Sequence, residues 1–380
     1  MIMGNIVKRK LLLGITAALV LLLASCGGEA GGQPPEDTAA VQGTVRTSGA
    51  EEADTASAEA APSVRTVMDG NGNSVEIPYE VKRIAAAGAL NQITLMLGGG
   101  DRLVATAEGV QKGFFAKVYP RIKEIPAAFT GSGAGTLNME TLLQARPEVL
   151  FGTASGDGEA ETLKSANIAS VGLKLVTTED IKNTIALVGR VLGPEAEKKA
   201  AGFIDYYNGN LAYASGKTKD APKVKVFIAG GDGSGGTITT TPKADINTSY
   251  IEAAGGVNVC AEEFASGSPA VNMEQILKWD PDVIIASSRA VYDGITAPES
   301  IWKDLRAVKS QAVYLNPKGV YLWSVRSAEG ALQPLWLAKV LHPEQCGDLD
   351  MRQKVREFYK EYYYYDVTDS ELDEIQEPKS

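Results

Sequence analysis

The chain has 380 residues, and its 37 Lys and Arg against 47 Asp and Glu give a formal net charge of −10. This acidic balance disfavours a nucleic-acid partner, because contact with phosphates requires a basic face. The single histidine, His342, disfavours a bare zinc site, which usually draws on several His or Cys ligands. A Ser-His-Asp catalytic triad would have to use this one histidine, and no nucleophile motif lies beside it. We therefore do not expect an enzyme.

The first 25 residues have the layout of a secretory signal. Residues 8–10 are basic, and residues 11–23 are apolar apart from a glycine and a threonine. This run is too short to span a bilayer, which needs about 20 apolar residues. The next residues, Leu23-Ala24-Ser25-Cys26, resemble the lipobox of bacterial lipoproteins, whose cysteine receives a diacylglyceryl group before cleavage. We therefore expect a signal peptide over 1–25 and a lipid on Cys26; an ordinary signal peptide or a membrane anchor is the alternative.

Residues 26–63 are expected to form the lipid anchor and a flexible linker. Between residues 27 and 62 the chain is mainly Gly, Ala, Glu, Thr and Ser, with Val41 and Val45 as its large apolar residues. Such a segment cannot bury enough apolar surface to offset the entropy lost on ordering.

A folded body is predicted to begin near residue 64 with a β-hairpin. Residues 64–68 and 74–78 flank a turn whose Asp, Gly and Asn residues tolerate positive φ. Strand-like apolar runs then alternate with helical patterns, at residues 83–87, 103–106, 149–153, 174–176, 224–229, 283–286 and 313–315. This alternation predicts α/β units with largely parallel sheets.

An internal repeat relates two parts of the body. Residues 137–151 recur as residues 271–285, and both copies contain Asn-Met-Glu, two aliphatic residues, and a Pro followed by an acidic residue. In each copy the Asn can cap a helix, the Met and the aliphatics at i+3 and i+4 form its buried stripe, and the Pro ends it before a strand. The chain is therefore expected to hold two similar lobes.

The lobes are expected at residues 64–178 and 221–380, with a linking helical segment over 179–220. Within that segment, residues 179–192 and 195–217 are predicted helices separated by Gly193-Pro194. A long helix would join the lobes stiffly.

These features together resemble the solute-binding proteins of ABC importers for ferric siderophores, haem and vitamin B12. The resemblance is carried by the hairpin leading into residues 81–85, by the paired Asn-Met-Glu helices, and by residues 336–343, and it covers nearly all of residues 64–375. It implies an α/β fold with two Rossmann-like lobes, mainly parallel sheets, a single long linking helix and a ligand cleft between the lobes.

For function, the resemblance implies a monomeric, non-enzymatic receptor that delivers a metal chelate to an ABC permease dimer with its ATPase. We expect a ferric siderophore, while haem and corrinoids such as cobalamin stay open, because an aromatic and arginine cleft serves all three. The metal would arrive inside its organic ligand, so no cofactor and no protein metal ligand are expected. The expected location is the outer face of the cytoplasmic membrane. The competing classes are an exported α/β enzyme and an adhesive lipoprotein.

Glu140 and Glu274 occupy the second helical position of the two repeats, away from the apolar stripe. An acidic side chain there can simply favour the helix dipole, which contributes about 0.3–1 kcal/mol. The resemblance implies a further role, because the family uses one surface glutamate on each lobe to meet arginines on the two permease subunits.

The cleft residues are expected on loops that follow strands, where α/β proteins place ligands. An aromatic pair with a nearby arginine suits a planar or anionic chelate; a packed strand with a surface arginine is the alternative. In the first candidate group, residues 319–324 alternate as in a strand, so that Tyr321 and Trp323 share a face, with Arg326 just beyond. The other two groups are Arg289 with Tyr292, and Gln111 with Lys112 and Phe114.

A glycine-rich segment and two cysteines each allow two interpretations. Residues 231–236 fit a dinucleotide-binding glycine pattern, but the β-branched run that follows is no helix start, so we expect a loop or hairpin instead. Cys260 and Cys346 would remain after lipidation of Cys26, and they can either form one disulfide or stay buried as free thiols.

Overall fold

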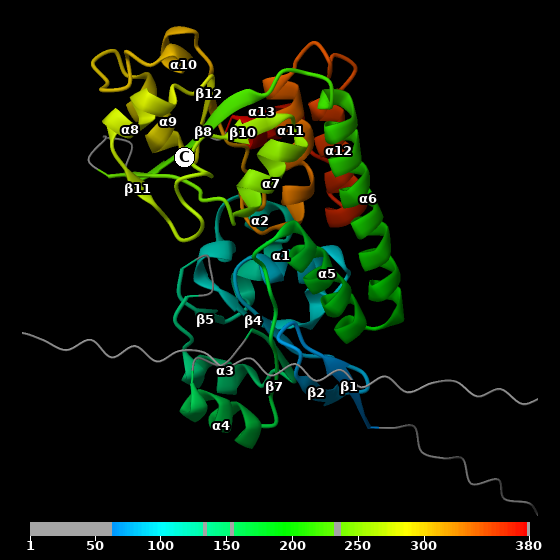
Figure 1. Ribbon diagram of the computed structural model, residues 1–380. Coiled ribbons are helices and arrows are strands. Elements are labelled where there is room, and N and C mark those ends of the chain that lie inside the picture. Colours follow the sequence, from blue (N-terminus) through cyan, green and yellow to red (C-terminus); the bar gives the residue numbers. More distant parts are fainter. Residues whose placement is uncertain (1–62, 132–134, 153–155, 232–236, 378–380) are drawn as a thin grey trace, which may run out of the picture. The chain divides into compact units, whose positions relative to one another are not determined.

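The computed structural model describes residues 63–131, 135–152, 156–231 and 237–377, and all described elements belong to one unit spanning residues 60–380 (Figure 1). The expected signal peptide, Cys26 and nearly all of the linker lie outside the described residues. Within the described ranges, no helix is both long enough and apolar enough to cross a membrane.

The body opens with the predicted hairpin, formed by β1 (Val64–Met68) and β2 (Ser74–Pro78). In the turn, the carboxylate of Asp69 accepts the amides of Asn71 at 2.9 Å and Asn73 at 2.7 Å. The hairpin is attached to the first lobe by a hydrogen bond of 2.7 Å from the Gly70 amide to the Gly172 carbonyl.

The first lobe is built on a parallel sheet with the strand order β5-β4-β3-β6-β7. Between β3 and β6 the order of the chain reverses, because β4 and β5 lie on one side of β3 and β7 lies beyond β6. Sheets of this kind hold ligands beyond the carboxyl ends of their strands at such a point. In chain order the elements, with η for a 3-10 helix, are β3 (Ile84–Ala86), α1 (Ala89–Met96), η1 (Gly100–Arg102), β4 (Leu103–Ala107), η2 (Glu108–Gln111), α2 (Gly113–Val118), η3 (Pro120–Glu124), β5 (Ala127–Phe129), α3 (Met139–Ala145), β6 (Val149–Phe151), α4 (Asp157–Ser165) and β7 (Ala169–Val171).

One predicted strand of this lobe is wrong. Residues 174–176 form no strand, and the edge of the sheet is β7 instead. The carbonyl of Lys174 accepts a side-chain hydrogen bond of 2.6 Å from the Thr184 hydroxyl rather than a bond from a neighbouring strand.

The second lobe has a mixed sheet with the order β11-β9-β8-β12-β13, and β10 also pairs with β8. Strand β9 runs antiparallel to β8, so a strand and not a helix follows residues 231–236. The predicted failure of the dinucleotide context is confirmed. The elements are β8 (Val224–Gly231), β9 (Ile238–Thr239), α7 (Ile246–Ala253), β10 (Gly256–Asn258), β11 (Ala270–Val271), α8 (Met273–Trp279), β12 (Val283–Ala286), α9 (Arg289–Thr296), α10 (Arg306–Lys309), β13 (Val313–Leu315), η4 (Ala328–Ala331), α11 (Gln333–Leu341), α12 (Met351–Tyr363) and α13 (Asp369–Gln376).

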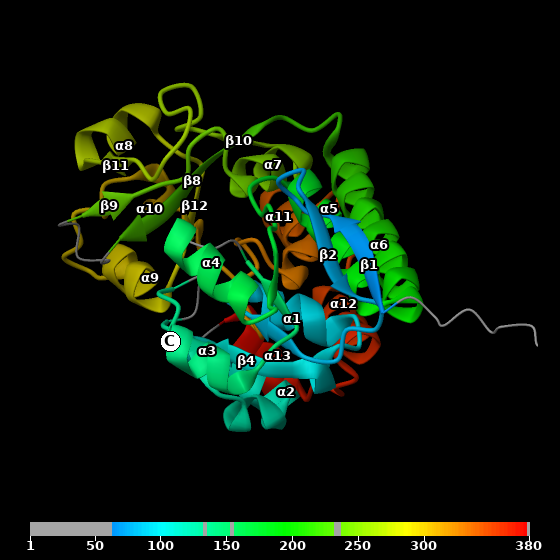
Figure 2. The same ribbon diagram turned by 90° about the horizontal axis from the view of Figure 1, so that it is seen from below.

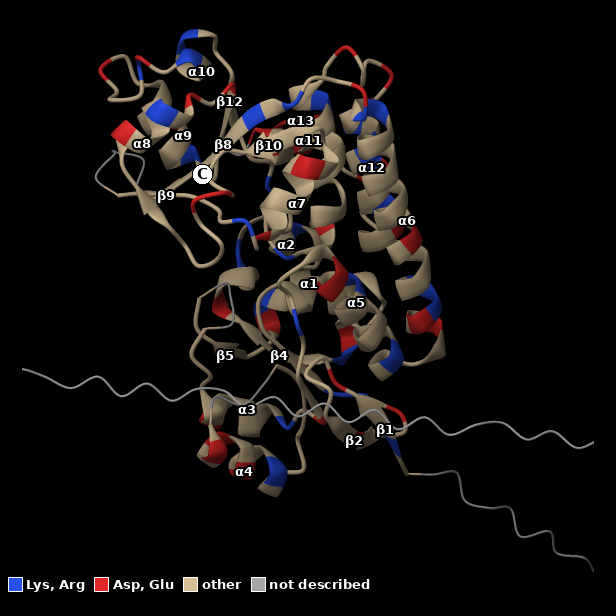
Figure 3. Ribbon diagram, viewed as in Figure 1, with Lys and Arg blue, Asp and Glu red and all other residues tan. Residues whose placement is uncertain are grey.

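Between the two sheets in the sequence lie α5 (Thr178–Leu192) and α6 (Pro194–Thr218), which pack side by side (Figure 2). Gly193 separates them with a φ of 111°, and Pro194 begins α6 at a position where a helix needs no amide donor. The 25 residues of α6 give it a length of about 37 Å. Acidic and basic segments alternate along α6, so neither charge forms a continuous stripe on it (Figure 3).

The repeat produces two helices, α3 and α8, with the same N-terminal cap. The side chain of Asn138 accepts the Thr141 amide at 3.0 Å, and that of Asn272 accepts the Gln275 amide at 2.9 Å. Each cap satisfies an amide that has no partner within the helix.

In each copy of the repeat, the acidic residue after the proline accepts backbone amides at the start of the first strand of its lobe's sheet. The carboxylate of Glu148 accepts the amides of Lys82 at 2.5 Å and Arg83 at 3.0 Å, directly before β3. The carboxylate of Asp282 accepts the amide of Lys225, the second residue of β8, at 2.8 Å. The Pro-Glu-Val and Pro-Asp-Val sequences thus fasten each lobe's first sheet strand to its repeat.

The predicted buried stripe of the repeat helices is only partly correct. Leu142 and Ile276 are fully buried, but the next aliphatic residues, Leu143 and Leu277, are 36% and 49% exposed. The helices have seven residues each, so their buried face is narrow and leaves these side chains outside it.

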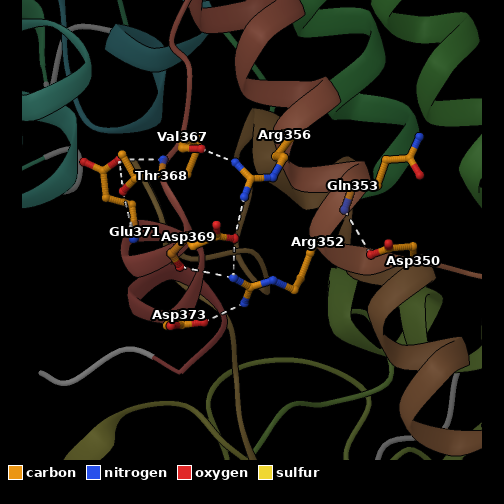
Figure 4. Close-up of polar contacts among 9 residues, drawn as sticks. All are labelled: Asp350, Arg352, Gln353, Arg356, Val367, Thr368, Asp369, Glu371 and Asp373. Atoms are coloured by element: carbon orange, nitrogen blue, oxygen red, sulfur yellow. Dashed lines mark hydrogen bonds and ion pairs between the residues drawn. The ribbon is translucent and has the colours of Figure 1, made fainter.

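The C-terminal helices α12 and α13 are held together by two arginines (Figure 4). Arg352 contacts Asp373 at 2.5 Å and Asp369 at 2.9 Å, and Arg356 contacts the same Asp369 carboxylate at 2.6 Å. Arg356 also donates to the carbonyl of Val367, between the two helices. Because these side chains are well exposed, their ion pairs add little stability, and their main effect is to fix the orientation of α12 relative to α13.

Aromatic side chains pack α12 onto the rest of the body. Phe358 contacts Phe203 of α6 with ring centroids 6.3 Å apart, and Tyr359 contacts Phe114 of α2 at 5.6 Å. Tyr364, the C-cap of α12, is 68% exposed. The C-terminal helices therefore touch both α6 and the first lobe.

Both cysteines within the described residues are buried free thiols, so the candidate disulfide between Cys260 and Cys346 is not formed. Cys346 belongs to the large hydrophobic core, whereas Cys260 belongs to a separate core of the second lobe. Cys260 is 3.3 Å from the hydroxyl of Thr240, and burial raises the pKa of its thiol to about 11.

Candidate functional site

A cavity of about 570 Å³ lies beyond the carboxyl ends of β3 and β6 and is lined by residues of both lobes. This is the crevice at which the strand order of the first lobe reverses, the usual ligand position in such sheets. Its volume is within the range of small-molecule sites, about 300–1,000 Å³.

One wall is the turn between β3 and α1. Gly88 has φ 49° and ψ −132°, a backbone conformation that a side chain would strain. The buried side chain of Asn91 fixes this turn, since its Nδ2 donates to the carbonyls of Ala86 at 2.9 Å and Gly88 at 3.1 Å. Thr106 in turn donates to Asn91 Oδ1 at 2.7 Å. The amides of Leu90 and Asn91 donate to the carbonyls of Ala87 at 3.0 Å and Gly88 at 3.3 Å, and the turn places the preceding residues, Gly88 and Ala89, at the cavity wall.

Most of the remaining lining from the first lobe is apolar. It comes from the end of β6, from the segment around β5 and from the segment after β7, and it includes Phe129, Leu137, Phe151, Leu173 and Leu175. Glu159 of α4 adds one carboxylate. A bound molecule would contact mainly hydrocarbon and aromatic surface on this side.

The second lobe contributes Tyr321, Val325 and Arg326, all from the segment between β13 and η4. Arg326 is held by Asp245 at 3.2 Å, and its side chain remains 41% exposed. Asp245 also caps α7 by accepting the Asn247 amide at 2.9 Å. Burial raises the pKa of Tyr321, so its hydroxyl stays neutral around pH 7. Among the described lining residues, Arg326 is the only cation.

This arrangement suits an anionic molecule with apolar surface. The helix N-terminus and the guanidinium both favour negative charge, and the apolar wall favours an organic body. No group of three or more His, Cys, Asp or Glu residues able to hold a metal ion occurs in the described part of the chain.

Of the first predicted group, Tyr321 and Arg326 line the cavity but Trp323 does not. Trp323 is completely buried in the hydrophobic core. The prediction assumed a strand over residues 319–324, in which alternate side chains share a face, but the segment is irregular. The amide of Trp323 instead donates to the Pro317 carbonyl at 3.2 Å and turns the side chain inward.

The second predicted group, Arg289 and Tyr292, lies at the start of α9 and borders a different hollow, together with Trp336 and Lys339. Arg289 stacks over the Tyr292 ring at 5.2 Å and pairs with Asp293 at 3.6 Å. These residues do not line the cavity, because α9 begins after β12 of the second lobe, away from β3 and β6.

The third predicted group has structural contacts instead. Gln111 donates to the Ile125 carbonyl at 2.7 Å, Lys112 pairs with Glu108 at 3.9 Å, and Phe114 is buried in the core. These residues follow β4 in the chain, whereas the cavity lies beyond the ends of β3 and β6.

Sequence reasoning missed the turn at Gly88 and the end of β6. The available signal was Gly88, which directly follows the strand predicted at residues 83–87. To use it, one also needs the order of the strands in the sheet, which the sequence does not state. The two predicted docking residues, Glu140 and Glu274, are both exposed at the second position of their helices.

Comparisons with known proteins agree with this architecture. The model of the Periplasmic binding protein family matches residues 85–319. The molybdate-binding protein MolA of Haemophilus influenzae is 25% identical over 329 residues, which cover 79% of this chain and 91% of MolA.

Solved structures show the same fold. A periplasmic solute binding protein from Veillonella parvula aligns with a TM-score of 0.72 at 25% identity, covering 82% of this chain and 97% of that one. MolA bound to molybdate aligns at 0.70 and 21% identity, covering 80% and 99%. The vitamin B12 binding protein BtuF of Vibrio cholerae aligns at 0.56 and 21% identity, covering 70% and 99%.

Proposed function

The chain belongs to the periplasmic binding protein family of ABC transporters, whose members are extracytoplasmic solute-binding proteins and not enzymes, and we propose that it captures an anionic metal chelate. The observation that carries this proposal is the lining of the 570 Å³ cavity, in which a mainly apolar wall faces Arg326 and the N-terminus of α1. A ferric siderophore is the ligand class we favour.

The size and polarity of the cavity support a chelate over a bare ion. A siderophore surrounds its iron with an organic shell, and that shell offers apolar surface to residues such as Phe129 and Leu175. Its negative charge would meet Arg326, which pairs with carboxylate or phenolate oxygens through several donors. Haem shares the apolar surface and the negative charge, and cobalamin shares the large organic surface, so both are alternatives; the BtuF structure, which has this fold, is that of a vitamin B12 binder.

Molybdate is a second candidate, favoured by the similarity to MolA. A tetrahedral oxyanion needs several convergent donors and little apolar surface. The amides at Gly88 and Ala89 and the guanidinium of Arg326 can supply such donors, but the apolar remainder of the cavity would be left to water.

A ligand titration of the full-length protein tests the proposal. Tryptophan and tyrosine fluorescence and calorimetry would be recorded with ferric enterobactin, haem, cobalamin and sodium molybdate at matched concentrations. We expect sub-micromolar binding of the ferric chelate and no heat with molybdate. Tight binding of molybdate alone would establish the second candidate, and no binding of any of the four would remove both.

Delivery is proposed to use the matched surfaces of α3 and α8, which would meet the two subunits of an ABC permease with its ATPase. Glu140 and Glu274 are exposed at equivalent positions. The neighbouring Leu143 and Leu277 are also exposed at equivalent positions, although both are apolar. An acidic and an apolar side chain repeated on each lobe would suit a partner that presents the same basic and apolar surface twice.

We also propose that Cys26 carries the lipid that keeps the protein at the outer face of the cytoplasmic membrane. The support is the sequence Leu23-Ala24-Ser25-Cys26 after an apolar run. Two or more acyl chains give stable anchoring where one is marginal. Cys26→Ser should abolish incorporation of radiolabelled palmitate and release the protein from the membrane fraction; unchanged labelling would reject the assignment.

A further inference from the structure

Glu329, in η4, is a completely buried carboxylate beside the ligand cavity. It accepts hydrogen bonds from two consecutive backbone amides, those of Val320 at 3.2 Å and Tyr321 at 2.6 Å. It also accepts the hydroxyl of Tyr359 from α12 and the side-chain amide of Gln92 from α1, the latter at 3.2 Å. One carboxylate thus collects donors from three separate parts of the chain.

These donors connect the two walls of the cavity. Gln92 lies one turn after the residues of α1 that line it, and its Oε1 accepts the Ala328 amide at 2.9 Å. Tyr321, whose amide the carboxylate holds, lines the opposite wall together with Arg326. The Gln92 and Glu329 side chains therefore bridge the first lobe to the segment that carries the cavity's cation.

The backbone around the carboxylate is shaped to admit it. A side chain at Gly319 would collide with both the Tyr359 hydroxyl and the Glu329 carboxylate. A side chain at Gly330 would come within 2.5 Å of the Tyr250 hydroxyl. Gly319 therefore leaves room for the carboxylate and the Tyr359 hydroxyl, while Gly330 leaves room for the neighbouring Tyr250.

No cation compensates the carboxylate among its described contacts. The titratable groups that face it are Tyr359 and Tyr363 of α12, while α1 contributes the neutral Gln92 and the 320–321 segment contributes amides. Burial raises the pKa of Glu329 to about 7, although all four hydrogen bonds act to lower it. The group can therefore change its charge near neutral pH.

We infer that Glu329 is a positioning residue, which ties the Tyr321 and Arg326 segment to α1 and so sets the separation of the two cavity walls. The carboxyl offers both oxygens as acceptors to four donors, and removing it leaves those donors without a partner. Because burial without a cation disfavours the ionised form, ionisation as the pH rises weakens the tie. The effect on binding rests on the proposed function, but the tie between the lobes does not.

Hydrogen exchange of the ligand-free, full-length protein tests the tie. In Glu329→Ala, the amides of Val320 and Tyr321 lose their acceptor, and peptides covering residues 319–326 should exchange at least tenfold faster. Asn210→Ala is the matched control, because Asn210 donates to the Ala331 carbonyl of the same η4 at 2.8 Å without touching the carboxylate. Equal protection of residues 319–326 in Glu329→Ala and the wild type would overturn the inference.

A pH series separates positioning from a purely structural role. After correction for intrinsic chemistry, wild-type exchange at residues 319–326 should slow between pH 8 and pH 6, because the closed segment binds the proton of Glu329 more tightly than an opened one, and Glu329→Gln should lose this dependence. If Glu329→Ala does not fold, Glu329→Gln and Tyr359→Phe carry the test. A pH profile shared by Glu329→Gln and the wild type would overturn the inference.

Ligand affinity is measured last, with ferric enterobactin and sodium molybdate as probes. For whichever probe binds the wild type, the affinity of Glu329→Gln should fall about fivefold to thirtyfold at pH 8. Unchanged affinity would contradict the link to binding. If neither probe binds the wild type, haem and cobalamin are tested in the same way, and if none of the four binds, the proposed function fails while the exchange data still decide the positioning role.

Discussion

The two lobes share a framework but contribute different walls to the cavity. In both lobes an Asn-capped helix is followed by a proline and by a carboxylate that fastens the first sheet strand, through Glu148 in one and Asp282 in the other. The cavity walls have no such correspondence. The first lobe supplies a glycine turn and apolar side chains, and the second supplies an irregular segment with Tyr321 and Arg326.

This difference separates two tasks in the molecule. The repeat maintains the framework and its outer surface, where Glu140 and Glu274 stand at equivalent positions. The first copy of the repeat also lines the cavity through Leu137, Leu150 and Phe151, whereas none of the described lining residues comes from the second copy, so the polar groups proposed to recognise the ligand lie outside the repeat. Substitutions in one part should therefore leave the task of the other part unchanged.

The pair Glu140→Arg with Glu274→Arg should affect delivery alone. If the repeated surface meets the permease, two like-charge contacts replace two attractive ones, and each costs several kcal/mol. We expect ligand uptake by whole cells to fall at least a hundredfold, while the dissociation constant of the ligand changes less than twofold.

The control for this pair is Glu344→Arg with Glu361→Arg, which reverses two exposed carboxylates outside the repeat. This control should transport normally. Normal uptake by the Glu140 and Glu274 double variant would show that the shared surface is a product of the common framework only.

Glu329 should make stability depend on pH. Its pKa is about 7 in the folded protein against an ordinary 4.5, so between these values the folded state holds a proton that the unfolded state has lost. The free energy of unfolding should therefore fall as pH rises from 4.5 to 7, by about 3 kcal/mol at most, and stay level above.

Urea denaturation of the wild type and Glu329→Gln at pH 5, 6, 7 and 8 measures this contribution. The difference between the two curves removes the titration of other groups. A constant difference across the series would contradict the raised pKa.

Arg326→Ala should weaken ligand binding about tenfold to a hundredfold, because hydrogen bonds to a charged group contribute about 1.5–3 kcal/mol. Arg289→Ala is the matched control, since that arginine borders a different hollow. Calorimetry with the ligand found in the screen would separate them. Equal losses for both variants would mean that net charge, and not the cavity wall, controls affinity.

The sequence predicted the framework better than the site, for a physical reason. Helices and strands of the framework leave periodic patterns, and the repeat made Asn138 and Asn272 visible as caps. The cavity depends on which strands are neighbours, and nothing in a single sequence states that β3 adjoins β6. Tyr321 and Arg326, which were chosen for their chemistry, line the cavity, whereas Trp323 is buried in the core because residues 319–324 are irregular and do not alternate as a strand would.

Glu329 illustrates the same limit. An acidic residue inside the sequence Ser-Ala-Glu-Gly gives no sign of burial, because charged residues are almost always exposed. Its partners lie 237 positions away at Gln92 and 30 positions away at Tyr359. Only the fold brings these groups together.

The smallest expected effect concerns the glycine turn of the first lobe. Gly88→Ala puts a side chain at φ 49°, which costs about 1–2 kcal/mol of stability, and Gly72→Ala in the hairpin should cost a similar amount at φ 87°. The two sites differ in what they adjoin, since Gly88 lines the cavity and Gly72 does not. Urea denaturation should therefore show similar losses, while only Gly88→Ala weakens ligand binding, by about threefold to tenfold. If both variants bind equally well, the apolar wall tolerates a shifted α1 terminus, and recognition rests on the second lobe's Tyr321 and Arg326.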